Sequence, residues 1–233
     1  MRIGVFAYNF EHWKTQAGIH NLMLAGYKPE VIFAADWKQL TAYRSKIRTA
    51  PCDLYLNHPK TIAALYDIDY HVAPHNSPAV ASLIKEYDLD LGVVLGARIL
   101  KPASFVNFRK GVLNMHPGIL PFNRGLDNIK WAIMKSLPQG VTTHLIDEKI
   151  DRGLLVESET IQIYKDDTIM DLQIRVQNLE QKKMISSIAL LANIQIEQLS
   201  PLQKGAYHNA MPPDVEKHLI QYMEQYTKKW SNK

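Results

Sequence analysis

The sequence lacks the marks of disulfide-bonded, membrane and exported proteins. Its 233 residues include one cysteine, Cys52, so no internal disulfide can form, and we interpret this thiol as structural rather than nucleophilic. No apolar run approaches the roughly 20 residues of a membrane-spanning helix, and the run at residues 3–7 is too short for a signal peptide. We therefore expect a cytoplasmic, soluble protein with no membrane partner.

Signatures of dinucleotide, metal and nucleic-acid binding are also missing. The sequence has no glycine-rich dinucleotide fingerprint, no Gly-Lys-Ser/Thr phosphate loop, no His-Glu-x-x-His pair and no paired-cysteine zinc pattern. We expect no metal, and we interpret His58, His71 and His75 as ordinary loop side chains. The net charge of +4 forms no basic stripe, which argues against a nucleic-acid partner and leaves an anionic small substrate compatible.

What the sequence does contain indicates a globular α/β protein. Hydrophobic residues make up 46% of the chain and charged residues 21%, which suits a buried core. Short apolar runs alternate with amphipathic stretches, as in a Rossmann-like, mostly parallel sheet covered by helices. Strands are expected at 3–7, 31–35, 91–95, 112–115, 141–146 and 154–163, helices at 15–25, 77–87, 126–136, 166–192 and 214–228, and weaker elements at 54–56, 61–66 and 70–72.

One segment near the middle of the chain carries the strongest chemical signal. Asn114 and His116 stand two residues apart at the end of a predicted strand, so their side chains project from the same face, while Met115 points into the core. Open α/β sheets bind ligands at this edge. Pro117 and Gly118 then allow a sharp turn. An isolated Asn-x-His pair is more typical of a capping or structural role, so a partner is needed.

A second segment, residues 140–153, offers that partner. It reads as an apolar strand that ends in an acidic loop, and a carboxylate there could hold the His116 tautomer or stabilise its imidazolium. Asp151 is one candidate and Asp147 is the competing one. From composition alone, either acid could equally lie on the surface of the loop.

Together these segments resemble the N10-formyltetrahydrofolate-dependent formyltransferase family. Residues 114–121, Asn-Met-His-Pro-Gly-Ile-Leu-Pro, are similar to the family's Asn-x-His-Pro-Ser-Leu-Leu-Pro, and Asp151 in Asp-x-Gly is similar to its later acidic element. The resemblance extends over about residues 88–193. Two positions depart from the pattern, because Gly118 replaces a serine and Arg152 replaces a small residue.

The resemblance implies a role for each candidate residue. Asn114 would donate a hydrogen bond to the formyl oxygen as it becomes an oxyanion, and His116 would share this work or move a proton. Asp151 would orient His116 and help to take the proton from the attacking amine. Transfer between two nitrogens passes through a tetrahedral intermediate, where one preorganised donor is worth roughly 3–4 kcal/mol, and the amine needs a base.

We expect two groups of binding residues, of which the resemblance implies the first. The co-substrate 10-formyltetrahydrofolate would lie against Arg98, Ile99, Leu100, Ile146 and Asp147. The acceptor would contact Tyr8, Asn9, Phe10, Gly118, Ile119, Leu120 and Arg124. The aromatic side chains at the end of the first strand fit either a platform for a sugar or nucleobase, or packing of the loop against the sheet.

Features at both ends of the chain favour the sugar N-formyltransferase branch. The first loop lacks the Ser-Asn phosphate loop of the glycinamide ribonucleotide enzyme, residues 196–233 are too few for the barrel of the initiator-tRNA enzyme, and the chain starts at its first strand without the hydrolase's extra domain. Residues 205–208, Gly-Ala-Tyr-His, resemble a segment of the sugar branch. The expected acceptor is a nucleotide-linked amino deoxysugar or a nonulosonic-acid precursor for polysaccharide biosynthesis.

A change to a more polar composition with three prolines after residue 195 indicates a division of the chain, and two functional alternatives stay open. We predict a formyltransferase catalytic domain over residues 1–195 and a C-terminal extension over 196–233 that serves dimer or substrate contacts, compatible with a homodimer. One alternative is a formyltetrahydrofolate hydrolase, in which water replaces the amine. The other is a non-catalytic folate- or nucleotide-binding module that keeps the fold.

Overall fold

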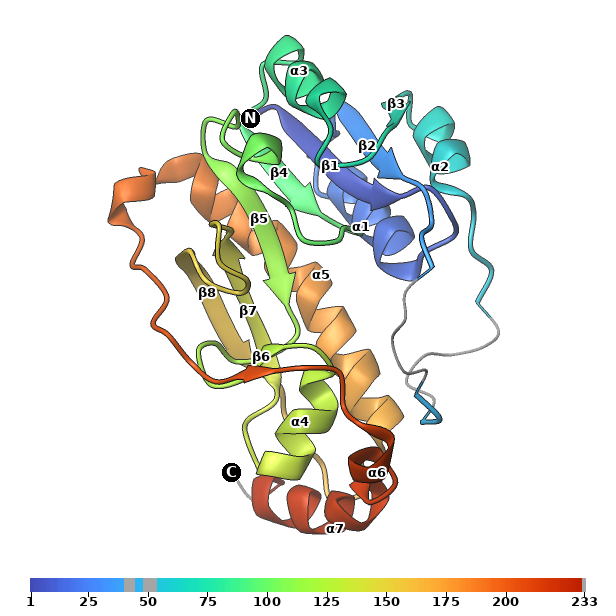
Figure 1. The fold of residues 1–233 in the computed structure, drawn as a ribbon, viewed down its shortest axis with the longest axis vertical. Helices are drawn as coiled ribbons and strands as arrows, with labels where there is room; N and C mark the ends of the chain where they lie inside the picture. Colours follow the sequence, from blue (N-terminus) through green and yellow to red (C-terminus); the bar gives the residue numbers. More distant parts are fainter. Residues whose placement is uncertain (40–44, 48–53, 232–233) are drawn as a thin grey trace.

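Seven strands form one sheet in the computed structural model, which describes residues 1–39, 45–47 and 54–231 (Figure 1). Cys52 lies outside the described residues. The spatial order is β3-β2-β1-β4-β5-β7-β8. The strands are β1 (Ile3–Tyr8), β2 (Val31–Ala35), β3 (Asp69–Val72), β4 (Leu91–Val94), β5 (Gly111–His116), β7 (Gly140–Leu145) and β8 (Leu154–Thr160).

The predicted mostly parallel sheet is confirmed, with a change of direction at one side. The strands β3, β2, β1, β4 and β5 pair in parallel, whereas β7 runs antiparallel to both β5 and β8. In this register Asn114 lies opposite His144, and His116 lies opposite Thr142. The loop after β7 therefore returns beside the strand that carries the Asn-x-His pair.

Helices cover the sheet, and several begin where the sequence supplies a cap. Ser77 accepts a hydrogen bond from the Val80 amide and is followed by Pro78, and Thr168 forms a capping box with Asp171. The helices are α1 (Trp13–Leu24), α2 (Pro59–Leu65), α3 (Pro78–Glu86), α4 (Asn128–Lys135), α5 (Ile169–Asn193), α6 (Pro213–Glu216) and α7 (Leu219–Trp230), with 3-10 turns η1 (Pro102–Ser104) and η2 (Ile196–Gln198).

Two apolar clusters form the core, one on each face of the sheet. Met115 is 1% exposed and packs into the cluster shared with α1 and α5, as predicted. Val112 belongs to the other cluster, which includes side chains of α3. Because side chains alternate along a strand, Asn114 and His116 project on the Val112 side. The sheet therefore directs the Asn-x-His pair to the face opposite α5.

The structure differs from the predicted elements in three places. Residues 54–58 form no strand, and the side chain of Tyr55 is 98% exposed, so the apolar run there has no sheet to join. The predicted helix over 214–228 is split into α6, which faces α4 through Glu216, and α7, whose apolar face packs against α4. The structure also pairs β6 (Arg124–Gly125) with β9 (Tyr207–His208). The sequence did not predict this pairing, because two residues are too few to show any periodicity.

The C-terminal extension runs along the edge of the sheet before it reaches α4. The Leu155 amide donates to the Ser200 carbonyl and the Leu202 amide donates to the Gly153 carbonyl, so the extension covers part of β8. Figure 1 shows α4, α6 and α7 gathered at the end of the molecule away from α3. The division at residue 195 stays a prediction. Among the described residues, no helix is long and apolar enough to cross a membrane.

Candidate active site

The end of β5 brings the imidazole of His116 to the carboxylate of Asp151. Nδ1 of His116 lies 3.3 Å from Oδ1 of Asp151, and the histidine is 3% exposed. Nε2 lies 2.8 Å from the Asn123 carbonyl oxygen and 2.8 Å from the side-chain amide of Asn128. Both ring nitrogens therefore have a polar neighbour in a place from which water is largely excluded.

Asp151 reaches this position from an unusual backbone conformation. Its φ of 49° lies in the left-handed region, where an aspartate is tolerated better than most residues. Its second carboxylate oxygen, Oδ2, accepts a hydrogen bond from the Gly125 amide at 2.7 Å. Burial alone would raise the pKa of Asp151, but the hydrogen bond and positive charge of His116, together with the Gly125 amide, hold this pKa below its usual value.

Asp147, the competing acid, makes a different contact. Its Oδ1 accepts a hydrogen bond from the Lys149 amide within the same loop. Of the two acids that the sequence offered, Asp151 is the one that lies beside His116. The residue types in this loop did not distinguish Asp151 from Asp147. The left-handed backbone turn at Asp151 decides which of the two side chains is directed at β5.

Asn114 is oriented by a residue that the sequence analysis did not select, His144. The Asn114 amide nitrogen lies 3.2 Å from Nε2 of His144, whose Nδ1 lies 2.6 Å from the Arg152 carbonyl oxygen. Because a carbonyl only accepts, Nδ1 of His144 carries the hydrogen and Nε2 accepts from Asn114. Burial, and then the charge of His116, lowers the pKa of His144 to about 4, so this ring is neutral near pH 7.

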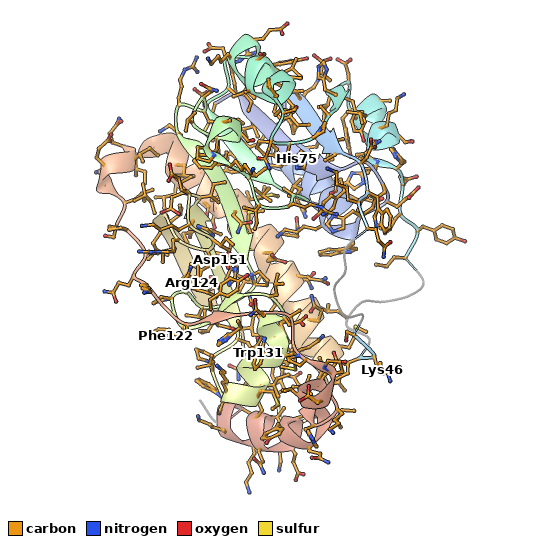
Figure 2. The ribbon with its side chains drawn as sticks, in the orientation of Figure 1. Lys46, His75, Phe122, Arg124, Trp131 and Asp151 are labelled. Atoms are coloured by element: carbon orange, nitrogen blue, oxygen red, sulfur yellow. The ribbon has the colours of Figure 1, made fainter. Side chains whose placement is uncertain are left out.

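Arg124 fastens the Asp151 loop to the C-terminal extension. Its guanidinium donates to the carbonyl oxygens of Ile150, Asp151 and Gly205. Figure 2 shows Arg124 and Asp151 close together near the middle of the molecule. The substrate contact predicted for Arg124 stays a prediction, and the contacts that the structure gives it are to backbone groups.

The predicted co-substrate residues come from two segments that meet in one apolar cluster. Leu100 and Ile146 both pack into the cluster on the Val112 face, on which Asn114 and His116 also project. Ile99 is 64% exposed beside them. Arg98 is exposed, and its guanidinium donates to the Lys38 carbonyl at 2.6 Å. The two segments thus meet on the face of the sheet from which Asn114 and His116 project, and the co-substrate contact predicted for them stays a prediction.

The predicted acceptor residues of the first loop lie at the carboxyl end of β1. The rings of Tyr8 and Phe10 stack with their centroids 4.9 Å apart, and the Tyr8 hydroxyl donates to the Ala97 carbonyl. Asn9 donates to Asp36 and accepts from the Tyr70 hydroxyl. Asn9 thus connects the end of β1 to the residue after β2 and to β3, while the stacked rings lie beside the segment of Arg98.

The remaining predicted acceptor residues belong to the turn after His116. The Thr142 hydroxyl donates a hydrogen bond to the Gly118 carbonyl. The oxygen of this hydroxyl, Oγ1, accepts a hydrogen bond from the Leu120 amide. Leu120 is buried and Ile119 is half-buried. These contacts fix the turn against β7.

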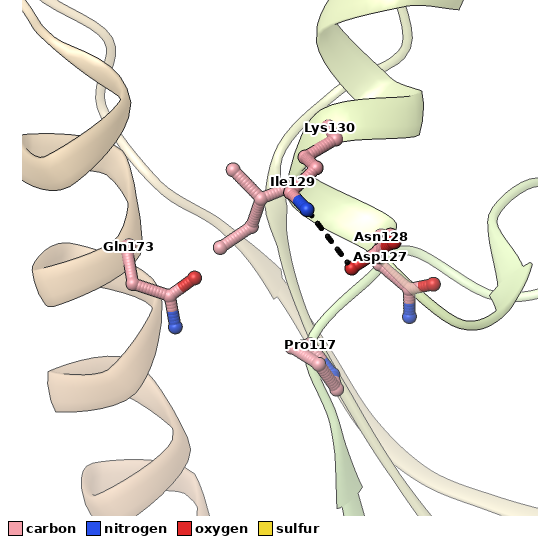
Figure 3. Close-up of a pocket in the computed structure, with 6 residues that line it drawn as sticks. All are labelled: Pro117, Asp127, Asn128, Ile129, Lys130 and Gln173. Carbon is pink, nitrogen blue, oxygen red and sulfur yellow. Dashed lines mark ion pairs between the residues drawn. The ribbon is translucent and has the colours of Figure 1, made fainter. Parts of the chain in front are cut away.

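A pocket of about 210 Å³ with a mixed polar and apolar lining opens beside Asn128 (Figure 3). Gln173 of α5 faces it, and Lys130 pairs with Asp127 across 3.3 Å at its edge. Its lining consists of Pro117, Asp127, Asn128, Ile129, Lys130 and Gln173. Within the part of the chain that the structure describes, no group of three or more His, Cys, Asp or Glu side chains is arranged to hold a metal ion.

Comparison with known proteins connects this geometry to one family. A family model described as formyl transferase matches residues 35–188. The methionyl-tRNA formyltransferase of Chlorobium chlorochromatii is 30% identical over 118 residues, which are 50% of this chain and 38% of that protein. The GDP-perosamine N-formyltransferase of Brucella melitensis is 30% identical over 110 residues, which are 46% of this chain and 42% of that protein. The chain thus matches less than half the length of these curated relatives.

Solved structures share the fold at lower identity. Glycinamide ribonucleotide transformylase 1 from Symbiobacterium toebii superposes with a TM-score of 0.63 at 21% identity, covering 87% of this chain and 94% of that one. A sugar N-formyltransferase from Shewanella sp. superposes with a TM-score of 0.62 at 20% identity, covering 94% of this chain and 85% of that one.

Proposed function

We propose, because the chain belongs to the formyl transferase family, that it transfers a formyl group from N10-formyltetrahydrofolate to the amine of an amino sugar. One observation carries the proposal. His116, at the end of β5 and two residues beyond Asn114 on the same face, is paired with Asp151. An amide donor, an imidazole and a carboxylate are the groups that transfer of an acyl group between two nitrogens requires.

The proposed reaction forms one C–N bond and breaks another. The acceptor amine attacks the formyl carbon, and the carbonyl oxygen of the tetrahedral intermediate becomes negative. Asn114 has two amide hydrogens, and His144 takes one, so the other can donate to this oxygen. Asp151, whose negative charge the adjacent His116 stabilises, accepts the proton that the amine loses and delivers it to N10 of the folate as the bond between N10 and the formyl carbon breaks.

The sugar acceptor is favoured over the other acceptors by the surroundings of the site. A nucleotide-linked sugar offers a flat base, and the stacked Tyr8 and Phe10 rings provide an aromatic surface at the same sheet edge. A relative named GDP-perosamine N-formyltransferase and a fold neighbour named sugar N-formyltransferase support this choice. Relatives named for methionyl-tRNA and for glycinamide ribonucleotide make those two acceptors the comparisons to include in the test.

A panel of acceptors tests the proposal. We expect formylated product, identified by its mass, with a nucleotide-linked amino sugar and 10-formyltetrahydrofolate, and little with the unlinked sugar, glycinamide ribonucleotide or initiator methionyl-tRNA. Efficient formylation of either of the last two would contradict the sugar assignment while keeping the chemistry.

Two other outcomes distinguish the remaining alternatives. Release of formate without an acceptor, as fast as with one, would indicate hydrolysis of formyltetrahydrofolate. Tight binding of folate or nucleotide with no turnover across the whole panel would indicate a non-catalytic binding module.

A further inference from the structure

The neighbours of His116 Nε2 determine where a hydrogen sits on the ring. A backbone carbonyl can only accept a hydrogen bond, so Nε2 must carry a hydrogen where it faces Asn123 at 2.8 Å. The Asn128 atom that faces Nε2 is therefore the amide oxygen and not the nitrogen. In that orientation the Asn128 nitrogen donates to the carbonyls of Gly125 at 3.0 Å and Leu126 at 3.2 Å, and the whole amide is satisfied.

Gly118 permits this close arrangement because it has no Cβ. A Cβ at this position would lie 2.8 Å from the Asn123 carbonyl oxygen and 3.1 Å from His116 Nε2. The first distance is shorter than a side-chain carbon tolerates, so the carbonyl would have to move away from the ring. The contact between the Asn123 carbonyl and Nε2 therefore depends on a glycine at position 118, where the resembling motif has a serine.

Asn128 is held in place by contacts on both sides. It is the first residue of α4, and its carbonyl accepts a hydrogen bond from the Asn123 side chain at 2.8 Å. The same first turn of α4 carries Lys130, which pairs with Glu216 of α6 at 2.8 Å. Asn128 is 4% exposed. The amide that faces His116 is thus fixed by its own turn and, through α4, by the C-terminal extension.

We propose that Asn128 is a positioning residue that, together with the Asn123 carbonyl, keeps a hydrogen on Nε2 of His116 and leaves Nδ1 directed at Asp151. The ring then exchanges protons with Asp151 through Nδ1 alone. The titratable groups that face the ring are Asp151 at Nδ1 and the neutral His144 of β7. The catalytic consequence rests on the proposed function, whereas the protonation pattern does not.

Nitrogen-15 spectra of the imidazole side chains test the protonation pattern without any substrate. In the wild-type protein Nε2 of His116 is expected to show the shift and the directly bonded proton of a protonated nitrogen at pH 7. Asn128→Ala should move this Nε2 resonance and speed exchange of its proton, because the acceptor oxygen beside Nε2 is lost. Asn193→Ala, an exposed asparagine at the end of α5, is the matched control.

The activity of the same variants tests whether this position matters for the reaction. Asn128→Ala should lower kcat by roughly tenfold to hundredfold with little change in KM for the folate, since misplacing a catalytic group costs rate rather than binding. Gly118→Ala should shift the Nε2 resonance in the same direction, because its Cβ displaces the Asn123 carbonyl, and it keeps the test open if Asn128→Ala does not fold.

Specific results would overturn this inference. An unprotonated Nε2 in the wild-type protein would do so, as would His116 resonances unchanged in both Asn128→Ala and Gly118→Ala. If the resonances move as expected but no acceptor is formylated, the proposed function fails and the positioning role of Asn128 stands.

Discussion

His144 shows how burial sets the chemistry of the site at the scale of one residue. Its ring is 1% exposed, accepts from Asn114 and donates to the Arg152 carbonyl, so it serves only in its neutral form. A histidine in an unfolded chain titrates near pH 6.5, whereas the pKa of His144 in the folded protein is about 4. The unfolded state therefore binds more protons than the folded state between these two values.

The free energy of unfolding should accordingly fall as the pH falls from about 6.5 to 4. His144→Gln, which keeps an acceptor oxygen for Asn114, should weaken this dependence, because it removes the group that must stay neutral. Urea unfolding at pH 7 and at pH 4.5 measures the effect, with the exposed His218→Ala as the control. A wild-type dependence that His144→Gln leaves unchanged would contradict the assignment.

The sequence predicted some of these residues and missed others for identifiable reasons. Asn114 and His116 could be selected because alternation along a strand places them together at a sheet edge. His144 could have been found by the same rule, but only with the knowledge that its strand pairs with β5 in that register. Asn128 had no signal, because its contact with His116 depends on a turn that brings the start of α4 back to the end of β5.

At the scale of elements, apolar runs and caps located most strands and helices. They did not reveal that β7 runs antiparallel to β5, because a fully buried strand looks the same in either direction. The pairing of β6 with β9 involves only two residues on each side and has no periodic pattern. Direction and short pairings depend on contacts between distant segments, which local sequence does not carry.

A largely buried ion pair joins α1 to α5 behind β5. Lys14 Nζ lies 2.7 Å from Glu180 and donates to the Met115 carbonyl at 3.1 Å. Glu180 is 5% exposed, so removing its partner leaves a buried charge without compensation. Lys14→Met should therefore destabilise the protein by about 3–5 kcal/mol.

The double variant Lys14→Met, Glu180→Leu should recover most of that loss, since the unpaired charge is gone. Urea unfolding of the two single variants and the double variant gives the coupling free energy between the residues. If Lys14→Met costs no more than a surface substitution, the pair does not hold α1 against α5.

At the scale of the whole molecule, Glu216 joins three segments that are distant in the sequence. It pairs with Lys130 of α4 and accepts hydrogen bonds from the Ser45 hydroxyl and the Lys46 amide. Figure 2 shows Lys46 beside the helices of the C-terminal extension. Burial would raise the pKa of Glu216, but Lys130, Ser45 and Lys46 lower it to about 2. The connection after β2 and the extension are thus fastened to the helix that carries Asn128.

This carboxylate should stabilise the fold above pH 4.5, and its contribution should be lost as the pH falls toward 2, because the folded state holds it ionised below its usual pKa. Glu216→Gln should lower the free energy of unfolding at pH 7, and its difference from the wild type should shrink between pH 4.5 and 3. The exposed Asp166→Asn serves as the control. A constant difference across this range would show that the ionised form is not what stabilises the contact.

The most direct test of the central claim is the rate of formyl transfer by His116→Ala and Asp151→Asn, measured with the acceptor that the wild-type protein uses. His218→Ala and Asp166→Asn, which change the same residue types at exposed positions, are the matched controls, and circular dichroism checks that each variant is folded. We predict that both site variants lose turnover by two or more orders of magnitude while the controls keep it. Turnover close to the wild-type rate in a folded His116→Ala protein would contradict the account.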